Sequence, residues 1–119
     1  MSDKKTYSGS CHCGNVRFDV SAEIREIVGC NCSICGKRGW LLVFVPREDF
    51  TLRSGEGTLT DYQFGNRHLH HLFCSTCGIG AFSRGTSKQG HEMIAVNVRC
   101  LEGIDPEHFS VKRFDGKSL

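Results

Sequence analysis

Ser10-Cys11-His12-Cys13-Gly14 is the stretch that decides the fold, because it carries two cysteines that a single residue separates. A second close pair, Cys74 and Cys77, follows much later in the chain. Cysteines at such spacing can reach one ion from a tight turn, but they are badly placed to form a disulfide with each other. Together the two pairs predict a closed four-thiolate zinc site, which would tie the first β segment to the middle of a sheet.

A third group, Cys30-Asn31-Cys32-Ser33-Ile34-Cys35, supplies three cysteines and predicts a second zinc site with one open position. A full ligand shell suits a structural role, whereas an open position suits catalysis or substrate binding. Cys100 stands alone and is expected to be a buried thiol, although it is also the best candidate to close the second site. The residues that follow the clusters, Gly14, Gly36 and Gly78, can take the positive φ that turns backbone N–H groups toward the thiolates.

Other uses of the cysteines compete with this interpretation. A disulfide framework would need an oxidising compartment, and the N-terminal residues show no secretion signal. A redox pair of the thioredoxin type at Cys74 and Cys77 would be expected within a βαβ pattern, which the sequence lacks. Two structural zinc sites, with the second closed by Cys100 or a histidine, form the alternative that stays open.

The rest of the chain predicts a mainly β fold of small antiparallel sheets pinned by zinc, with at most short helical turns. Val16, Phe18 and Val20 alternate with polar residues, as in a half-buried strand. Further strands are predicted over 24–28, 40–45, 50–53, 58–64, 67–73, 79–83 and 93–98, with a hairpin-type turn at 54–57 and helical turns at 47–50 and 105–107. No linker or repeat divides the chain, so we expect one zinc-binding domain over residues 1–119, with disorder in the first few residues.

Composition restricts the compartment and the partners. The 119 residues carry a formal charge of +2, but two zinc ions held by the thiolates of both sites would bring it to about −1, so we infer no nucleic-acid partner. No apolar run approaches the roughly 20 residues of a membrane span. We therefore expect a cytoplasmic protein, because thiols stay reduced there.

Four motifs carry a resemblance to a known family: Gly9-Ser10-Cys11-His12-Cys13-Gly14-Asn15-Val16-Arg17-Phe18, Cys30-Asn31-Cys32-Ser33-Ile34-Cys35, Phe73-Cys74-Ser75-Thr76-Cys77-Gly78 and Asn97-Val98-Arg99-Cys100-Leu101. In this order they resemble the glutathione-dependent formaldehyde-activating enzyme family, which includes the centromere protein V-like proteins. The resemblance implies a fold of small zinc-pinned sheets called a β-tent. It also implies a structural zinc on Cys11, Cys13, Cys74 and Cys77, and a catalytic zinc on Cys30, Cys32 and Cys35. The chain is shorter than the enzymes that gave the family its name, and its 32–40 segment is closer to the centromere protein V-like branch.

The expected function is that of a zinc-dependent carbon–sulfur lyase acting on a thiol adduct. It resembles S-(hydroxymethyl)glutathione synthase, with glutathione or an adduct of it as the partner. Lys37, Arg38 and Arg99 are candidates to bind the carboxylates of such a substrate, or are simply solvated surface charges. The alternative function is a non-enzymatic zinc-stapled module that binds a protein or a small ligand.

Three histidines, His68, His70 and His71, lie on a predicted strand. With a period of two, His68 and His70 share one face and His71 takes the other. This strand could supply a general base or a metal ligand, although surface or half-buried imidazoles are the simpler interpretation.

Overall fold

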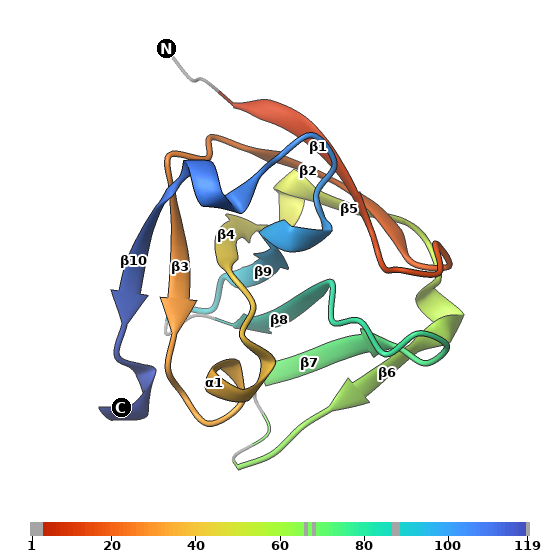
Figure 1. Cartoon of the computed structure of the whole chain (residues 1–119). Helices are drawn as coiled ribbons and strands as arrows, with labels where there is room; N and C mark the ends of the chain where they lie inside the picture. Colours follow the sequence, from red (N-terminus) through yellow and green to blue (C-terminus); the bar gives the residue numbers. More distant parts are fainter. Residues whose placement is uncertain (1–3, 66, 68, 87–88, 119) are drawn as a thin grey trace.

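The computed structural model describes residues 4–65, 67, 69–86 and 89–118, which fold into two β-sheets joined by short turns (Figure 1). The three-stranded sheet has the order β1-β2-β5, with β1 at Lys5–Ser10, β2 at Arg17–Ala22 and β5 at Phe50–Ser54. The seven-stranded sheet has the order β10-β3-β4-β9-β8-β7-β6. Its strands are β3 (Glu26–Cys30), β4 (Leu42–Pro46), β6 (Leu59–Tyr62), β7 (Leu69–Cys74), β8 (Phe82–Thr86), β9 (Glu92–Asn97) and β10 (Ser110–Phe114). The disorder expected for the first few residues concerns positions 1–3, which lie outside the described residues, as does His68.

Helical structure in the described part of the chain is limited to one short α-helix and several 3-10 turns. The helix α1 spans Cys35–Arg38 and is followed by Gly39 in the left-handed conformation. The 3-10 turns are η1 (Arg47–Asp49), η2 (Glu56–Thr58), η3 (Val98–Cys100), η4 (Pro106–His108) and η5 (Gly116–Ser118). The predicted fold class, mainly β with at most short helical turns, is therefore confirmed. Within the described ranges, none of the helices has the length and apolar character that crossing a bilayer requires.

Three phenylalanines join the two sheets. Phe18 of β2, Phe50 of β5 and Phe82 of β8 form one cluster, with ring centroids 5.2 Å apart for Phe18 and Phe50 and 4.7 Å apart for Phe50 and Phe82. Phe18 and Phe82 are buried, and burying such a side chain stabilises the fold by about 1.5–3 kcal/mol, whereas Phe50 is partly buried. A smaller apolar cluster of Cys35, Trp40 and Leu42 packs instead against Cys30 and Cys32.

The strand predictions lie within a few residues of the observed strands, but the predicted hairpin is wrong. β5 pairs with β2, whereas β6 pairs with β7, so the segments that flank residues 54–57 belong to different sheets. Gly55 lies against the backbone of Asn15, where a Cβ would come within 2.4 Å of the Asn15 carbonyl oxygen. This contact holds the turn against the three-stranded sheet while η2 leads the chain into the other sheet.

One strand pair departs from the predicted antiparallel pattern. β10 runs parallel to β3, from Ser110 opposite Glu26 to Phe114 opposite Cys30. The remaining strand pairs among the described residues are antiparallel. The parallel pairing brings the C-terminal segment to the end of β3 that carries the second cysteine group (Figure 1).

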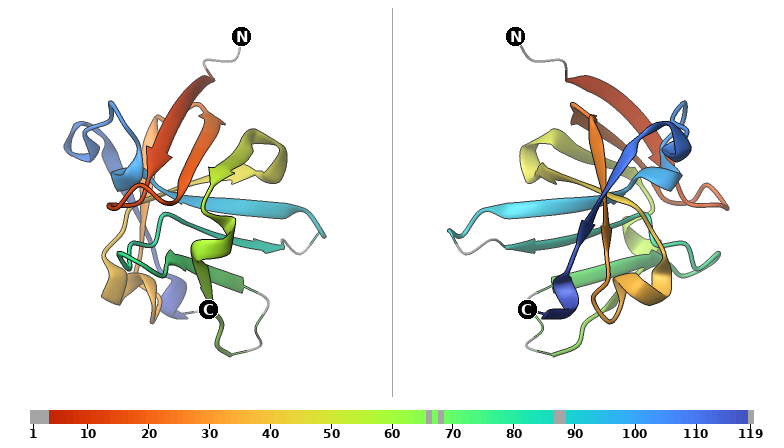
Figure 2. Two further views of the ribbon diagram at one scale, coloured as in Figure 1. Left: turned by 90° about the vertical axis from the view of Figure 1, so that its right-hand side faces the viewer. Right: turned by 60° about the vertical axis from the view of Figure 1, so that its left-hand side comes forward.

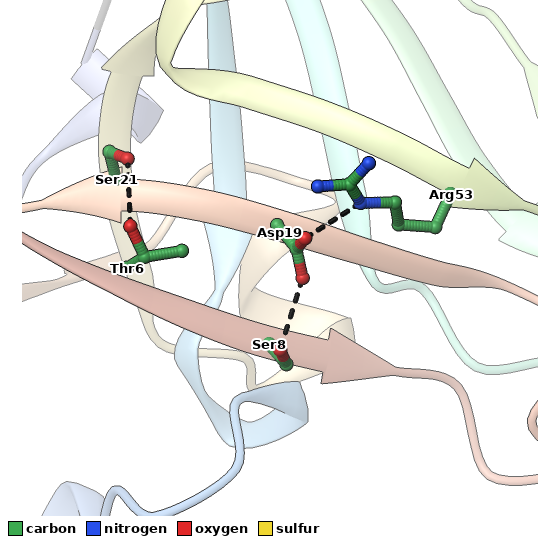
Figure 3. Close-up of polar contacts among 5 residues, drawn as sticks. All are labelled: Thr6, Ser8, Asp19, Ser21 and Arg53. Carbon is green, nitrogen blue, oxygen red and sulfur yellow. Dashed lines mark hydrogen bonds and ion pairs between the residues drawn. The ribbon is translucent and has the colours of Figure 1, made fainter.

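Polar side chains link the strands of the three-stranded sheet on the face opposite Phe18 (Figure 3). Asp19 of β2 accepts a hydrogen bond from the Ser8 hydroxyl of β1 at 3.0 Å and pairs with Arg53 Nε of β5 at 2.7 Å. The Arg53 guanidinium, and then the Ser8 hydroxyl, lower the pKa of Asp19. This carboxylate therefore connects all three strands of the sheet.

Asp19→Asn is expected to lower the melting temperature at pH 7, and the difference from the wild type is expected to shrink as the pH falls toward 3. The pKa of Asp19 is lower in the folded than in the unfolded chain. Its stabilising effect is therefore present above the unfolded pKa of about 3.9 and is lost as the pH falls through the folded value. Melting curves at pH 7, 5 and 3 check this, with the exposed Glu48→Gln as control. A difference that stays constant down to pH 3 would contradict the assignment.

Candidate metal centres and the adjoining pocket

Cys11, Cys13, Cys74 and Cys77 form the first cysteine group. Cys11 and Cys13 lie in the loop between β1 and β2, whereas Cys74 ends β7 and Cys77 follows it. The four Sγ atoms lie within 4.8 Å of one another, with 3.6 Å between Cys11 and Cys13 and 3.6 Å between Cys13 and Cys74. The group therefore joins the three-stranded sheet to the seven-stranded sheet.

The spacing of these sulfurs fits a metal ion and not a disulfide. Thiolates at about 2.3 Å from a zinc ion in a tetrahedron lie about 3.8 Å from one another. The observed separation of 3.6 Å is close to that value. A disulfide needs sulfurs at about 2.05 Å, and all eight cysteines are free thiols. The first group could therefore hold a metal ion.

Backbone N–H groups point at the sulfurs of the first group. The Val16 N–H donates to Cys11 Sγ at 3.3 Å. The backbone N–H of Cys13, and then that of Ile79, lower the pKa of Cys77 to about 6. The pKa of Cys74 is also lowered, first by the backbone N–H of Cys77. Thiolates supported in this way are ready ligands for a cation.

The glycines that follow the clusters differ in conformation. Gly14 and Gly78 have φ values of 84° and 81°, as predicted. Gly36 instead lies inside α1, where its N–H donates to the Cys32 carbonyl oxygen at 2.8 Å. The prediction of a positive φ is wrong at Gly36, because Cys35 already begins a helix.

Cys30, Cys32 and Cys35 form the second cysteine group, whose Sγ atoms also lie within 4.8 Å of one another. The Cys32 N–H donates to Cys30 Sγ at 3.5 Å, and Trp40 Nε1 donates to Cys35 Sγ at 3.3 Å. Burial raises the pKa of Cys35 to about 12, against the effect of the Trp40 hydrogen bond. Burial also raises the pKa of Cys32, but hydrogen bonds, of which the largest comes from the Cys35 backbone N–H, lower this pKa below its ordinary value overall. Three sulfurs at this spacing could hold a second metal ion.

No histidine, carboxylate or further cysteine among the described residues completes the second group. Cys100 instead packs against the core cluster that contains Cys11 and Cys74 of the first group. Burial, and then the charges of Cys11 and Cys77, raise the pKa of Cys100 to about 11. His70 Nδ1 lies 2.6 Å from Asp61 Oδ2. The described part of the chain therefore offers the second group three ligands.

The C-terminal segment packs beside the second group through Asn31. The Asn31 N–H donates to the Phe114 carbonyl oxygen at 3.2 Å, and its side-chain amide donates to Asp115 Oδ1 at 2.9 Å. Asn31 Oδ1 accepts from the Lys117 N–H at 2.9 Å. Figure 2 shows this end of the chain beside the loop that leads into α1. Gly116 fits so closely that a Cβ there would come within 2.7 Å of Cys30 Sγ.

Gly116→Ala is expected to weaken metal binding at the second group by about tenfold, because overpacking costs about 1–3 kcal/mol. The new methyl group would press on Cys30 Sγ, which lies within 2.7 Å of its position. A Co²⁺ titration that is monitored by the absorption of the cobalt–thiolate bonds measures the metal affinity of both cysteine groups. Gly57→Ala is the matched control, because nothing lies within 4 Å of a Cβ there. Equal Co²⁺ affinities in the two variants would exclude this contact as a determinant of the site.

A pocket of about 470 Å³ opens beside the second group, and all three of its cysteines line the walls. Another wall carries His71, which is 6% exposed and stacks on Phe64 with ring centroids 5.3 Å apart. His71 Nδ1 is buried and has no hydrogen-bond partner among the described residues. Burial, and then the positive charge of Arg38, lower the pKa of His71. The ring is therefore neutral at pH 7 and can accept a proton.

Comparison with known proteins places the chain in a family. Residues 6–113 match the family described as glutathione-dependent formaldehyde-activating enzyme. The chain belongs to this family. A crystal structure of a Rhodobacter sphaeroides protein is similar to it, with 34% sequence identity, a TM-score of 0.77, and coverage of 88% of this chain and 99% of that chain. The resemblance drawn from the cysteine motifs is thereby confirmed.

The three cations predicted to bind substrate do not line the pocket of this formaldehyde-activating family member. Lys37 is exposed on α1, and Arg99 is exposed in η3. The Arg38 guanidinium stacks over the Trp40 ring at 4.6 Å from its centroid, and its Nη1 is buried without a hydrogen-bond partner among the described residues. Arg38 therefore contacts Trp40, which is one of the residues that line the pocket.

Sequence reasoning missed two parts of the site in this family member. The first is the C-terminal segment, since no strand was predicted over 110–114, although Phe109 and Val111 alternate with Ser110. The second is the hydrogen bond that the buried Trp40, which also lines the pocket, donates to Cys35 Sγ. The predicted alternation of the histidines is confirmed for His70 and His71, since the first pairs with an acid and the second is buried.

Proposed function

We propose that the protein is a zinc-dependent carbon–sulfur lyase that makes and breaks the bond between a thiol sulfur and a carbonyl carbon, with glutathione as the thiol. The observation that carries this proposal is the opening of the second cysteine group onto a pocket that also holds His71. The glutathione-dependent and formaldehyde-activating description of the family supports it. The need for reduced thiols favours a cytoplasmic location.

In this proposal the two cysteine groups have different roles. Cys11, Cys13, Cys74 and Cys77 would hold a structural zinc, since four ligands close the tetrahedron. Cys30, Cys32 and Cys35 would hold a catalytic zinc, since three ligands leave one position for a substrate. Zinc bound there supplies one property, the lowering of the pKa of a thiol so that it ionises at neutral pH.

His71 is the residue that we propose to move the proton. In the cleavage direction the hydroxyl proton of the adduct passes to the neutral imidazole, the freed electron pair forms the carbonyl bond, and the carbon–sulfur bond breaks to leave a thiolate. In the bonding direction the imidazolium returns the proton to the carbonyl oxygen. The buried and unpartnered Nδ1 of His71 supports this role.

We propose that the carboxylates of the thiol substrate bind to Lys37, Arg38 and Arg99. Lys37 and Arg38 follow the third cysteine of the second group by two and three residues. Their guanidinium and ammonium groups could pair with a peptide carboxylate that extends out of the pocket.

Exchange NMR of glutathione and formaldehyde tests the proposed function. The zinc-loaded protein is expected to accelerate the equilibration of the adduct, and His71→Gln is expected to slow the accelerated rate by about a hundredfold, since general acid–base catalysis contributes at least that much. His70→Gln is the matched control, because His70 pairs with Asp61 on the other face of the same strand. A wild-type protein that does not accelerate equilibration, with two zinc ions that added thiols cannot reach, would favour the non-enzymatic binding module.

A further inference from the structure

We infer that the preferred carbonyl partner of the reaction is larger than formaldehyde, an aldehyde with an apolar chain or ring that occupies the pocket beside the second cysteine group. The inference rests on the proposed function, because it assigns the part of the adduct that lies next to the sulfur. It starts from the chemistry of the pocket walls.

Apolar side chains dominate the pocket. Its lining includes Trp40, Leu42, Phe44, Leu69, Met93 and Phe114. Among the described lining residues, Arg84 alone carries a fixed charge. Glutathione has two carboxylates and an ammonium group, so its peptide would lose hydration in such a pocket, where Arg84 is the one charged side chain among the described lining residues that could pair with it. The pocket therefore suits the other half of the adduct.

The rim of the pocket exposes apolar surface to water. Phe44 is 51% exposed, Leu69 42% and Phe114 46%, and these are three of the six large hydrophobic residues exposed in the described chain. They come from β4, β7 and β10, so they lie together because of the fold and not because they are close in sequence. Contiguous exposed apolar surface marks a binding site. Its continuity with the three cysteines points to a ligand that reaches both.

The size of the pocket also exceeds what a one-carbon partner needs. Its volume of about 470 Å³ lies in the range of sites for drug-sized ligands. A hydroxymethyl group would leave most of the apolar wall exposed to water, whereas each methylene group buried in the pocket strengthens binding by about fourfold. An aldehyde with several carbons would gain this binding at no change in the chemistry. The thiol sulfur still bonds to the carbonyl carbon, and the carbonyl oxygen takes up the proton that the thiol loses.

Binding of S-alkyl glutathiones, which are unreactive mimics of the adduct, tests the inference. Trp40 is the single tryptophan and lines the pocket, so its fluorescence reports occupancy. In the zinc-loaded protein, S-hexylglutathione is expected to bind at least about tenfold more tightly than S-methylglutathione. Phe44→Ala is expected to remove most of this gain. Tyr62→Ala is the matched control, because Tyr62 is also 51% exposed but does not line the pocket.

Four other outcomes of these measurements would overturn the inference, and each points to a different explanation. Equal affinities for the methyl and hexyl compounds, in a protein that turns over formaldehyde and glutathione, leave the proposed function intact and exclude an apolar carbonyl partner. A gain for hexanethiol over ethanethiol, without a gain for S-hexylglutathione, assigns the apolar group to the thiol instead. Sedimentation as a dimer, with no gain for any alkyl compound, assigns the rim to a second copy of the chain. A hexyl gain in a protein that accelerates no glutathione–aldehyde pair would refute the enzyme, and the inference with it.

Discussion

Cys74→Ser is expected to leave the protein largely unfolded at 25 °C. Cys74 is fully buried and ends β7, and its sulfur lies 3.6 Å from that of Cys13 in the loop between β1 and β2. A metal ion held by this group would therefore link the two sheets, which the phenylalanine cluster also joins. Structural zinc contributes about 10–16 kcal/mol in small peptides, whereas whole domains are stable by only about 5–15 kcal/mol. Removing one of four ligands forfeits enough of that energy to unfold the chain.

Circular dichroism and zinc content measure this effect. The wild type is expected to hold two zinc ions and to unfold when a strong chelator removes them, whereas Cys74→Ser is expected to show no cooperative melting. Cys100→Ser is the matched control, because Cys100 is half-buried near the same group but is not one of its members. It should cost about 1 kcal/mol, or a few degrees of melting temperature. If Cys74→Ser melts cooperatively and at the same temperature as Cys100→Ser, the proposed structural role of the first group is wrong.

The cysteine groups could be predicted from the sequence because the information is local. A spacing of one or two residues places two sulfurs on one turn, whatever the rest of the fold does. The same holds for β2, where Phe18 and Val20 alternate with polar residues and are both buried. Local rules of this kind also predicted the helical turn at η4. Its N-terminal cap is Asp105, whose side chain accepts a hydrogen bond from the Glu107 N–H at 3.0 Å.

Features that depend on which strands become neighbours could not be predicted. β1 and β10 have few alternating apolar residues, and they form because β2 and β3 offer them an edge. The helix α1 has four residues, too few for a period to be seen. The apolar rim of the pocket gathers Phe44, Leu69 and Phe114 from strands that the sheet order brings together. The two cysteine groups could thus be predicted from the sequence, whereas the pocket beside the second group could not.

Cys32→Ser separates the second group from the first and is expected to abolish catalysis while the fold persists. A serine hydroxyl stays protonated at neutral pH and cannot replace the thiolate that zinc requires. The second group spans the end of β3 and the start of α1, and with Trp40 and Leu42 it belongs to the smaller apolar cluster. Loss of a metal ion from this group would leave the contact between the two sheets in place.

The expected readings are a fall from two zinc ions to one, a change of a few degrees in melting temperature, and loss of about a thousandfold or more in the rate of adduct equilibration. That loss corresponds to about 4 kcal/mol of the barrier, the effect of removing the group that ionises the thiol. Ser33→Ala is the matched control, because Ser33 is the exposed neighbour of Cys32 in the same loop. Should Cys32→Ser unfold with Cys74→Ser, the second group would be structural; should it keep its full rate, the reaction would have to occur elsewhere. Because only this variant is expected to lose activity and one zinc ion without losing the fold, the comparison assigns one role to each group.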